Sequence, residues 1–362
     1  MRALVTGANG LLGSNLVREL ITRGHEARAM VRRTSNVEGL AGLDTSMVYG
    51  DVRNIDELTR AAEGCDVIFH TAAVFSYWGY TREVMMETAK GGVTNALDAA
   101  KAAGSKRVVL TSSTAVFGGS DGPKVLDEHA ALVEVGVPDY FASKAIQERV
   151  ALEHAAKVGV ELVVANPSLF VGSYDYRPSA SLATITGYLG DPLKITYPGG
   201  VNIIHAGDVA IGHILLAERG EPNEHYVIAA ENVTWREVHD TISELCGVPK
   251  PRIKVTRTPA LAAASLMELA AKITRKAPLA TRALAEQTGR YFWYSNAKIA
   301  RLGFLPRSMR QTLTQTIAWL LVSPHLTNKQ RAKLRPHDDV LQAMRQAQVA
   351  QRLKSVRIQD LS

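Results

Sequence analysis

Long apolar runs and cysteines are both scarce in this chain of 362 residues. The nearest approach to a membrane-spanning run, residues 260–273, is interrupted by Glu268 and Lys272, so no membrane span is expected. Only two cysteines occur, Cys65 and Cys246, which excludes a disulfide framework and is typical of a reducing compartment. The opening MRALVTG lacks the pattern of a signal peptide. We therefore expect a cytoplasmic protein.

Excess charge is also small over most of the chain. The net charge is +7, but residues 323–362 hold eight basic and three acidic residues, which leaves only +2 for residues 1–322. A nearly neutral body does not indicate a nucleic-acid-binding surface. We interpret residues 323–362 as a solvated basic tail and expect no nucleic-acid partner.

Short apolar runs alternate with amphipathic stretches in the N-terminal half. With 46% apolar residues, the chain can bury a large core and a smaller one. Apolar strands without polar alternation indicate a parallel sheet covered on both faces. The predicted class is α/β, a doubly wound parallel sheet with a smaller, mainly helical substrate-binding domain. Strands are predicted at 2–6, 26–31, 66–70, 106–112 and 160–166, and helices at 11–23, 54–63, 82–103 and 139–158.

The alternation weakens after about residue 170. Residues 202–220 predict a strand, a cap at Asp208 and a helix. Residues 225–247 repeat this plan, and Thr234 and Glu237 have the spacing of a capping box. Both segments are therefore candidates for a return to the first domain.

The rest of the C-terminal half has a different composition. Residues 172–200 are rich in Gly, Pro, Ser and Tyr, and residues 258–290 are mostly helical and apolar. We expect this part to cover the carboxyl ends of the strands and to bind substrate. The predicted organisation is a cofactor-binding domain at 1–171, with segments near 200–232 packing back onto it, a substrate-binding region at 172–322 and a basic tail at 323–362.

A glycine-rich turn joins the first predicted strand to the first predicted helix. TGANGLLG spaces Gly7, Gly10 and Gly13 as GxxGxxG. Glycine lets the backbone approach a pyrophosphate, whose charge is favoured by the free N–H groups at a helix start. Because the turn lies in the first strand–helix–strand unit, it predicts a dinucleotide site.

Two arginines indicate which dinucleotide is bound. An acidic residue after the second strand usually holds the ribose 2′-hydroxyl of NAD, whereas arginine accommodates the 2′-phosphate of NADP. Here Arg32 and Arg33 follow that strand, and no acidic residue occurs before Glu38. We predict NADP(H) in preference to NAD(H); the alternative is that both arginines only solvate a loop.

The run DYFASKAIQER places Tyr140 and Lys144 four residues apart at the start of a predicted helix. Positions i and i+4 lie on one helical face, so both side chains can act on one small volume. The unperturbed pKa of tyrosine is near 10, and a neighbouring ammonium favours the charged phenolate. We therefore expect Lys144 to lower the pKa of Tyr140.

Together these motifs resemble the extended branch of the short-chain dehydrogenase/reductase superfamily, the NAD-dependent epimerase/dehydratase family, and especially its dihydroflavonol reductase-like members. The resemblance covers roughly residues 1–322. The stretches that carry it are TGANGLLG at 6–13, GDV at 50–52, HTAA at 70–73, LTSSTAVFG at 110–118, YFASK at 140–144, NPS at 166–168, TWREV at 234–238 and SNAKIARLGF at 295–304.

The resemblance implies a hydride-transfer site. Tyr140 exchanges a proton with the substrate oxygen, Ser113 orients that oxygen with Ser112 and Thr114 as rivals, and Lys144 also holds the nicotinamide ribose. Ala89 stands where the family commonly has Asn, which alters the supporting proton relay. The implied cofactor contacts are Gly7, Asn9, Gly10, Leu11, Leu12, Gly13, Arg32, Arg33, Asp51, Val52, Thr71, Ala72, Ala73, Tyr140, Lys144, Pro167 and Ser168.

The substrate is less well defined. VVANPSLFVGS at 163–173 resembles the reductases of this branch rather than its sugar-nucleotide members. An aromatic wall would suit an apolar or aromatic carbonyl compound, although aromatic residues in loops equally serve packing. The predicted wall residues are Phe75, Tyr77, Trp78, Phe117 and Tyr174.

Three functions follow from these residues. The leading interpretation is an NADPH-dependent reductase of a ketone or aldehyde, with a small-molecule carbonyl substrate and no metal. The alternatives are a nucleotide-sugar epimerase or dehydratase with tightly bound NAD(P), and a catalytically inactive cofactor-sensing regulator. Whether the chain forms a homodimer is left open.

Overall fold

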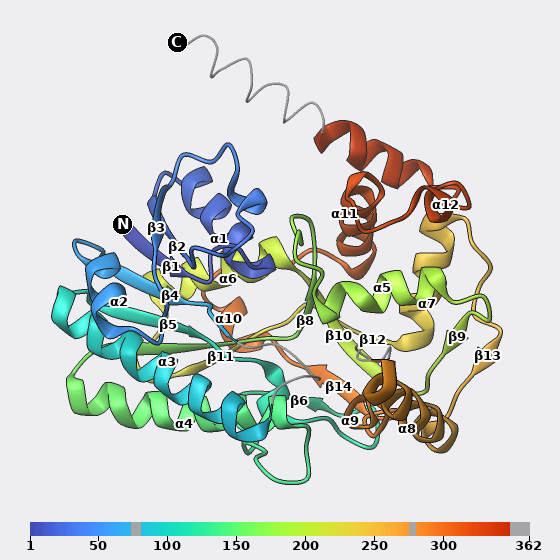
Figure 1. The fold of residues 1–362 in the computed structure, drawn as a ribbon, viewed down its shortest axis with the longest axis horizontal. Helices are drawn as coiled ribbons and strands as arrows, with labels where there is room; N and C mark the ends of the chain where they lie inside the picture. The colour runs from blue at the N-terminus through green and yellow to red at the C-terminus, as the bar shows by residue number, and fades with distance from the viewer. Residues whose placement is uncertain (74–80, 275–279, 348–362) are drawn as a thin grey trace.

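The computed structural model describes residues 1–73, 81–274 and 280–347. Its main element is a seven-stranded sheet in the order β11-β7-β5-β4-β1-β2-β3, in which every neighbouring pair is parallel (Figure 1). The strands are β1 (Arg2–Thr6), β2 (Glu26–Val31), β3 (Ser46–Tyr49), β4 (Val67–His70), β5 (Arg107–Thr111), β7 (Glu161–Pro167) and β11 (His225–Ile228).

Helices cover both faces of this sheet. Successive residues of β1 enter different cores: Ala3 and Val5 pack with helices α1 and α6, and Leu4 packs with α2, α3 and α4. The central strands β1, β4, β5 and β7 are almost entirely buried, and the predicted doubly wound α/β class is confirmed. These helices are α1 (Leu11–Thr22), α2 (Ile55–Ala62), α3 (Arg82–Ala103), α4 (Asp139–Val158) and α6 (Ala206–Arg219).

The strand register aligns the carboxyl ends. Thr6 lies opposite His70, His70 opposite Leu110, and Leu110 opposite Val164. The loops that follow these strands therefore leave the sheet from one edge. The order of the strands reverses between β4 and β1, and ligands of such sheets bind in the crevice outside the carboxyl ends at that point.

The smaller part of the molecule combines helices with short strands (Figure 1). One sheet has the order β12-β10-β14-β6, with β8 also paired to β10, and β9 pairs with β13. The strands are β6 (Val125–Leu126), β8 (Leu169–Val171), β9 (Ile195–Thr196), β10 (Gly200–His205), β12 (Glu231–Thr234), β13 (Ile253–Lys254) and β14 (Tyr291–Tyr294). The helices are α5 (Ala180–Gly190), α7 (Trp235–Cys246), α8 (Arg257–Thr274), α9 (Arg282–Ala285), α10 (Ala297–Ala300), α11 (Met309–Val322) and α12 (Asn328–Arg331), and the 3-10 turns are η1 (Glu38–Leu40) and η2 (Thr114–Phe117).

The two predicted helix caps have different outcomes. The capping box between Thr234 and Glu237 is present at the start of α7, so that prediction is confirmed. The cap predicted at Asp208 is wrong, because β10 continues directly into α6 and His205 is the N-cap, its ring accepting from the Gly207 N–H. Asp208 is buried in the first turn.

Residues 323–347, the described part of the expected basic tail, pack against the smaller part. Leu326, Leu334 and Val340 are buried in one hydrophobic core with residues of α5, α7 and α11. Asp339 also forms an ion pair of 2.9 Å with Arg310 of α11. Residues on both sides of the boundary expected at residue 322 therefore belong to one hydrophobic core.

Within the described ranges, no helix is both long enough and apolar enough to cross a membrane.

Candidate active site

At two positions, the turn between β1 and α1 has room for glycine only. Gly7 has a φ of +64°, and a Cβ there would lie 2.9 Å from the Cα of Ala72. A Cβ at Gly13 would lie 2.3 Å from the carbonyl oxygen of Gly7 and 2.7 Å from the Cα of Ala8. A side chain at Gly7 or Gly13 would therefore force the backbone of the turn to move.

The start of α1 has the features of an anion site. Gly10 is the N-cap of α1 and offers no side-chain acceptor to the first helical N–H groups. A phosphate can accept from these groups and is favoured by the positive end of the helix. The tight turn and the uncapped helix start together fit a dinucleotide pyrophosphate.

Other predicted cofactor residues lie along the same edge. Thr71 follows β4, and its hydroxyl donates to the carbonyl oxygen of Thr6 at 2.7 Å, so this loop is held against the end of β1. Ala72 is next to Gly7. Pro167 ends β7, and the hydroxyl of Ser168 donates to Asn202 at 2.7 Å.

The two predicted arginines directly follow β2. Arg32 and Arg33 are exposed, and the Arg33 guanidinium lies 5.3 Å from the centre of the Tyr49 ring. Arg53 was not among the predicted residues; it pairs with Asp51 at 2.7 Å and holds the pKa of that carboxyl below its usual range. Arg53 directly follows the GDV stretch at 50–52, and this position next to a predicted cofactor contact could have indicated it.

The structure brings Ser113 and Tyr140 together. Ser113 is the N-cap of η2, directly after β5, and its side chain forms a hydrogen bond with that of Tyr140. Of the two rivals, Thr114 instead bonds Tyr294. Ser112 is buried, and its hydroxyl finds no hydrogen-bond partner among the described residues. Ser113 is thus the serine positioned to act with Tyr140.

The expected lowering of the Tyr140 pKa by Lys144 is wrong for the protein alone. Burial raises the pKa of Tyr140 to about 12, and the hydrogen bond from Ser113 opposes this rise only in part. Loss of hydration disfavours the phenolate more than the local interactions favour it. Tyr140 therefore carries its proton at neutral pH, which is the state required of a proton donor.

Lys144 is a buried ammonium with defined partners. Its Nζ donates to the carbonyl oxygen of Thr111 and to Oε1 of Gln147, both at 2.9 Å. Burial lowers the pKa of Lys144 to about 8, whereas the negative charge of Glu148 acts to raise it. An ammonium has three donors, so this arrangement leaves capacity for one further acceptor.

Gln147 connects this lysine to the position where the chain departs from the family pattern. Its Nε2 donates to the carbonyl oxygen of Ala89 on α3 at 3.3 Å, while its Oε1 accepts from Lys144. A side-chain amide therefore bridges the two helices. Sequence analysis missed Gln147, although its position three residues after Lys144 places it on the same face of α4.

Glu148 is fully buried behind the lysine, and sequence analysis missed it too. Its Oε1 accepts from Asn166 Nδ2 at 2.5 Å, and the same Nδ2 lies 3.3 Å from the carbonyl oxygen of Ser113. His225 Nδ1 lies 3.1 Å from Oε2, close enough for an ion pair but not aligned as a hydrogen bond. A buried carboxylate thus links the supports of Ser113 and Lys144.

The predicted aromatic wall is only partly described. Phe117 is buried in a core cluster with Val116, Ala145 and Tyr294. Tyr174 lies against α1, with its ring centre 3.6 Å from the Arg18 guanidinium carbon. The remaining predicted wall residues, Phe75, Tyr77 and Trp78, lie outside the described residues.

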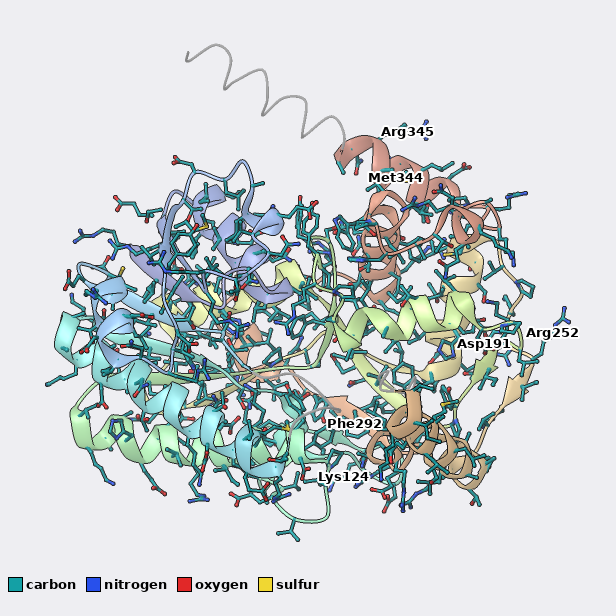
Figure 2. The ribbon with its side chains drawn as sticks, in the orientation of Figure 1. Lys124, Asp191, Arg252, Phe292, Met344 and Arg345 are labelled. Carbon is teal, nitrogen blue, oxygen red and sulfur yellow. The ribbon has the colours of Figure 1, made fainter. Side chains whose placement is uncertain are left out.

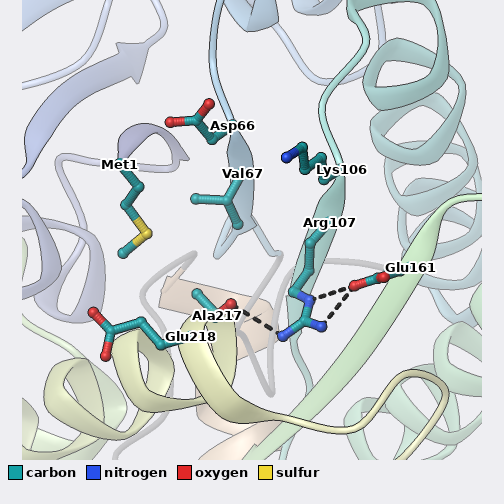
Figure 3. Close-up of a pocket in the computed structure, with 8 residues that line it drawn as sticks. All are labelled: Met1, Asp66, Val67, Lys106, Arg107, Glu161, Ala217 and Glu218. Atoms are coloured by element: carbon teal, nitrogen blue, oxygen red, sulfur yellow. Dashed lines mark hydrogen bonds and ion pairs between the residues drawn. The ribbon is translucent and has the colours of Figure 1, made fainter.

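A shallow pocket occurs at the opposite edge of the sheet (Figure 3). It lies at the amino ends of β4, β5 and β7, where Arg107 and Glu161 form an ion pair of 2.6 Å. None of the predicted site residues lines it. Its lining residues are Met1, Asp66, Val67, Lys106, Arg107, Glu161, Ala217 and Glu218.

Comparisons with known proteins agree with the geometry. The family model described as "NAD dependent epimerase/dehydratase family" matches residues 3–229. A Synechocystis sp. protein named provisionally as a dihydroflavonol 4-reductase is 31% identical, covering 87% of this chain and 93% of the relative. "Sterol demethylase protein B" of Methylococcus capsulatus is also 31% identical, covering 88% and 98%. "Cinnamoyl-CoA reductase 2" of Arabidopsis thaliana is 28% identical, covering 89% and 93%.

Solved structures share the fold. The crystal structure of gox2253 has a TM-score of 0.78 and 30% sequence identity, covering 92% of this chain and 99% of that one. The dTDP-glucose 4,6-dehydratase DesIV of Streptomyces venezuelae, solved with NAD and TYD bound, has a TM-score of 0.71 and 24% identity, covering 91% and 100%.

Replacing Gly13 by alanine is expected to weaken dinucleotide binding by about tenfold or more, because the turn must shift away from the anion site. Fluorescence titration with NADPH and NADH measures this loss. Gly91→Ala is the matched control, since a Cβ there meets nothing within 4 Å. Wild-type affinity in a folded Gly13→Ala protein would contradict the assignment of this turn.

Proposed function

Because this chain belongs to the NAD dependent epimerase/dehydratase family, we propose that it is an NADPH-dependent reductase of a ketone or aldehyde. The observation that carries the proposal is the hydrogen bond between Ser113 and Tyr140, with Lys144 one helical turn further along α4. Membership of the family also makes the chain an NAD(P)-dependent oxidoreductase. The proposal assigns residues 1–171, with α6 and β11, to cofactor binding and residues 172–322 to substrate binding.

Each proposed catalytic residue has a defined role. The bound nicotinamide supplies the hydride that forms the new C–H bond at the carbonyl carbon. Ser113 orients the carbonyl oxygen, and Tyr140 gives this oxygen its phenolic proton as the π electron pair moves onto oxygen. The Lys144 ammonium stabilises the phenolate that remains. The substrate would gain a hydride, which brings two electrons, and a proton, and would so become an alcohol, while a bound NADPH would be left as NADP⁺.

The protonation state of Tyr140 is compatible with its role as proton donor. Burial raises the pKa of Tyr140 to about 12, so the phenol keeps its proton in the neutral range. The epimerase and dehydratase alternatives begin with oxidation of a sugar hydroxyl. Carbonyl reduction is favoured over them because similar proteins are named as dihydroflavonol 4-reductase and cinnamoyl-CoA reductase.

Preference for NADPH is supported by charge at the end of β2. Arg32 and Arg33 are both exposed there, and no acidic residue follows the strand before Glu38. A guanidinium can pair with the ribose 2′-phosphate in a bidentate manner. The ribose of NAD lacks this phosphate, so the two arginines add little to its binding affinity.

The proposed substrate is an apolar or aromatic carbonyl compound. Similar proteins are named for dihydroflavonol, sterol and cinnamoyl-CoA chemistry. Near Tyr140, the ring of Phe141 lies 6.2 Å from the Tyr140 ring and 6.0 Å from that of Phe292 on β14. These aromatic neighbours suit an apolar molecule better than a charged one.

Replacing Tyr140 by phenylalanine removes the proton donor and keeps the ring. The proposal predicts that kcat falls by about a hundredfold to ten-thousandfold, with NADPH affinity unchanged. NADPH oxidation with a panel of carbonyl compounds finds the substrate and measures the loss. Ser113→Ala should also lose activity, whereas its matched control Ser112→Ala should not. Equal turnover of Tyr140→Phe and wild type would refute the mechanism.

The double variant Arg32→Ala/Arg33→Ala is expected to reduce the preference for NADPH over NADH by about tenfold or more, because charge-assisted bonds to the 2′-phosphate are lost. Binding titrations with both cofactors measure this ratio. Arg301→Ala is the control, since Arg301 is exposed and follows α10, which packs on β11 at the far edge of the sheet. An unchanged ratio in the double variant would exclude the assignment.

Glu148→Gln tests the charge balance at Lys144. Removal of the negative charge takes away the interaction that raises the lysine pKa, so this pKa falls below its present value of about 8. The protonated lysine is then lost at lower pH, and the alkaline limb of the kcat/KM profile moves to lower pH. Glu153→Gln on the exposed side of α4 should leave the profile unchanged. A limb that stays in place or moves upward would contradict the role of Lys144.

A further inference from the structure

Helix α8 has an unusual distribution of side chains for a globular protein. Its buried residues are two alanines, Ala264 and Ala271. Its large apolar side chains point outward: Leu266 is 69% exposed, Leu269 59% and Ile273 77%. Surface helices of globular proteins normally turn this kind of stripe toward the core.

The exposed residues form one continuous face. Leu266, Leu269 and Ile273 occupy positions i, i+3 and i+7, which stack along one side of a helix. Met267 borders this side and is 37% exposed. Shortly before the helix, Ile253 of β13 is 43% exposed. We call the three residues Leu266, Leu269 and Ile273 the apolar face of α8.

The inward side of α8 is already occupied. The helix packs against α9, and Oε1 of Glu268 accepts from the backbone N–H of Arg282 at 2.7 Å. Figure 1 shows α8 and α9 at the outer margin of the smaller part, near β6 and β14. The apolar face therefore points away from the contact that holds the helix in place.

Basic residues are concentrated on α8 and on the segment just before it. Residues 250–274 contain five basic residues and one acidic residue, a net charge of +4, although residues 1–322 as a whole carry only +2. All five are exposed, and Figure 2 shows Arg252 at the outer edge of the smaller part. They are Lys250, Arg252, Lys254, Arg257 and Lys272.

We propose that α8 docks the protein on the surface of an anionic lipid bilayer, with its apolar face inserted among the acyl chains and its basic residues at the phosphate level. Apolar residues on one side of a helix together with a surplus of basic residues are the properties of interfacial helices. Lysine and arginine stems reach from the apolar zone to the headgroups. Each basic residue near an anionic surface adds about fivefold to partitioning.

Charge favours a bilayer over a second copy of the chain as the occupant. If two α8 helices met through their apolar faces, the basic residues of both copies would also be brought together, and like charges repel. Anionic lipid neutralises the same residues. The charge around α8 is thus complementary to lipid and not to itself.

This docking surface is connected to the proposed site through the chain. Residues 286–290 lead from α9 into β14, and Figure 2 labels Phe292 of that strand. The Phe292 ring packs against that of Phe141, which lies beside Tyr140. An apolar carbonyl compound dissolved in lipid could enter from this side. The docking itself does not depend on the reductase proposal, because binding to vesicles is measured without turnover.

Sedimentation of the full chain with lipid vesicles tests this inference. We expect binding to phosphatidylcholine vesicles that contain about 30% phosphatidylglycerol, and much weaker binding to phosphatidylcholine alone or at high salt. Leu266→Gln/Leu269→Gln/Ile273→Gln should reduce partitioning on the order of a hundredfold. Lys254→Gln/Arg257→Gln should reduce it by about fivefold per residue.

A matched control uses exposed apolar residues elsewhere. Val135 and Leu305 are 91% and 90% exposed, and Val135→Gln/Leu305→Gln should bind vesicles like the wild type. Circular dichroism and thermal unfolding establish that each variant is folded. Equal vesicle binding by the wild type and the triple α8 variant would overturn the proposal. Failure of the wild type to bind anionic vesicles would also overturn the proposal. If light scattering then finds a dimer that the triple variant disrupts, a second copy of the chain covers the apolar face of α8 instead.

Discussion

The buried ammonium of Lys144 is the constraint around which the proposed site is built. A charge removed from water is costly unless it is paired and hydrogen-bonded. Here the carbonyl oxygen of Thr111, the amide of Gln147 and the carboxylate of Glu148 together offset this cost. These partners join α4 to the end of β5 and, through Ala89, to α3. The same bonds that hold the charge also fix the position of Tyr140 one turn earlier on α4.

A second constraint is the close approach of backbone segments at the carboxyl edge of the sheet. The turn at Gly7 lies so near Ala72 that neither segment can move toward the other. Aligned strand ends then bring the cofactor turn, Ser113 and the end of β7 to one edge. The chemistry proposed for this edge needs both constraints, because one places the dinucleotide and the other places the proton donor.

The sequence predicted those features that depend on local pattern. Strands buried on both faces are mostly apolar, so most strands of the main sheet and the helices on its faces were predicted, whereas the exposed edge strand β3 was not. The Gly7–Gly13 turn joins β1 to α1 as expected, and its role in cofactor binding stays a prediction. Glu148 and Gln147 were missed because a polar residue on a helix is usually exposed. The pKa of Tyr140 was predicted in the wrong direction because only the neighbouring charge was considered, and the depth of burial depends on the fold. The YFWY strand at 291–294 and the outward face of α8 were likewise decided by tertiary packing.

A crystal structure of the complex with NADP⁺ tests the central claim most directly. We expect the pyrophosphate at the start of α1, the Lys144 Nζ within about 3 Å of a hydroxyl of the nicotinamide ribose, and the Tyr140 hydroxyl facing the reactive side of the nicotinamide ring. A dinucleotide bound away from the Gly7–Gly13 turn would contradict the account. A nicotinamide ring out of reach of Ser113, Tyr140 and Lys144 would do the same.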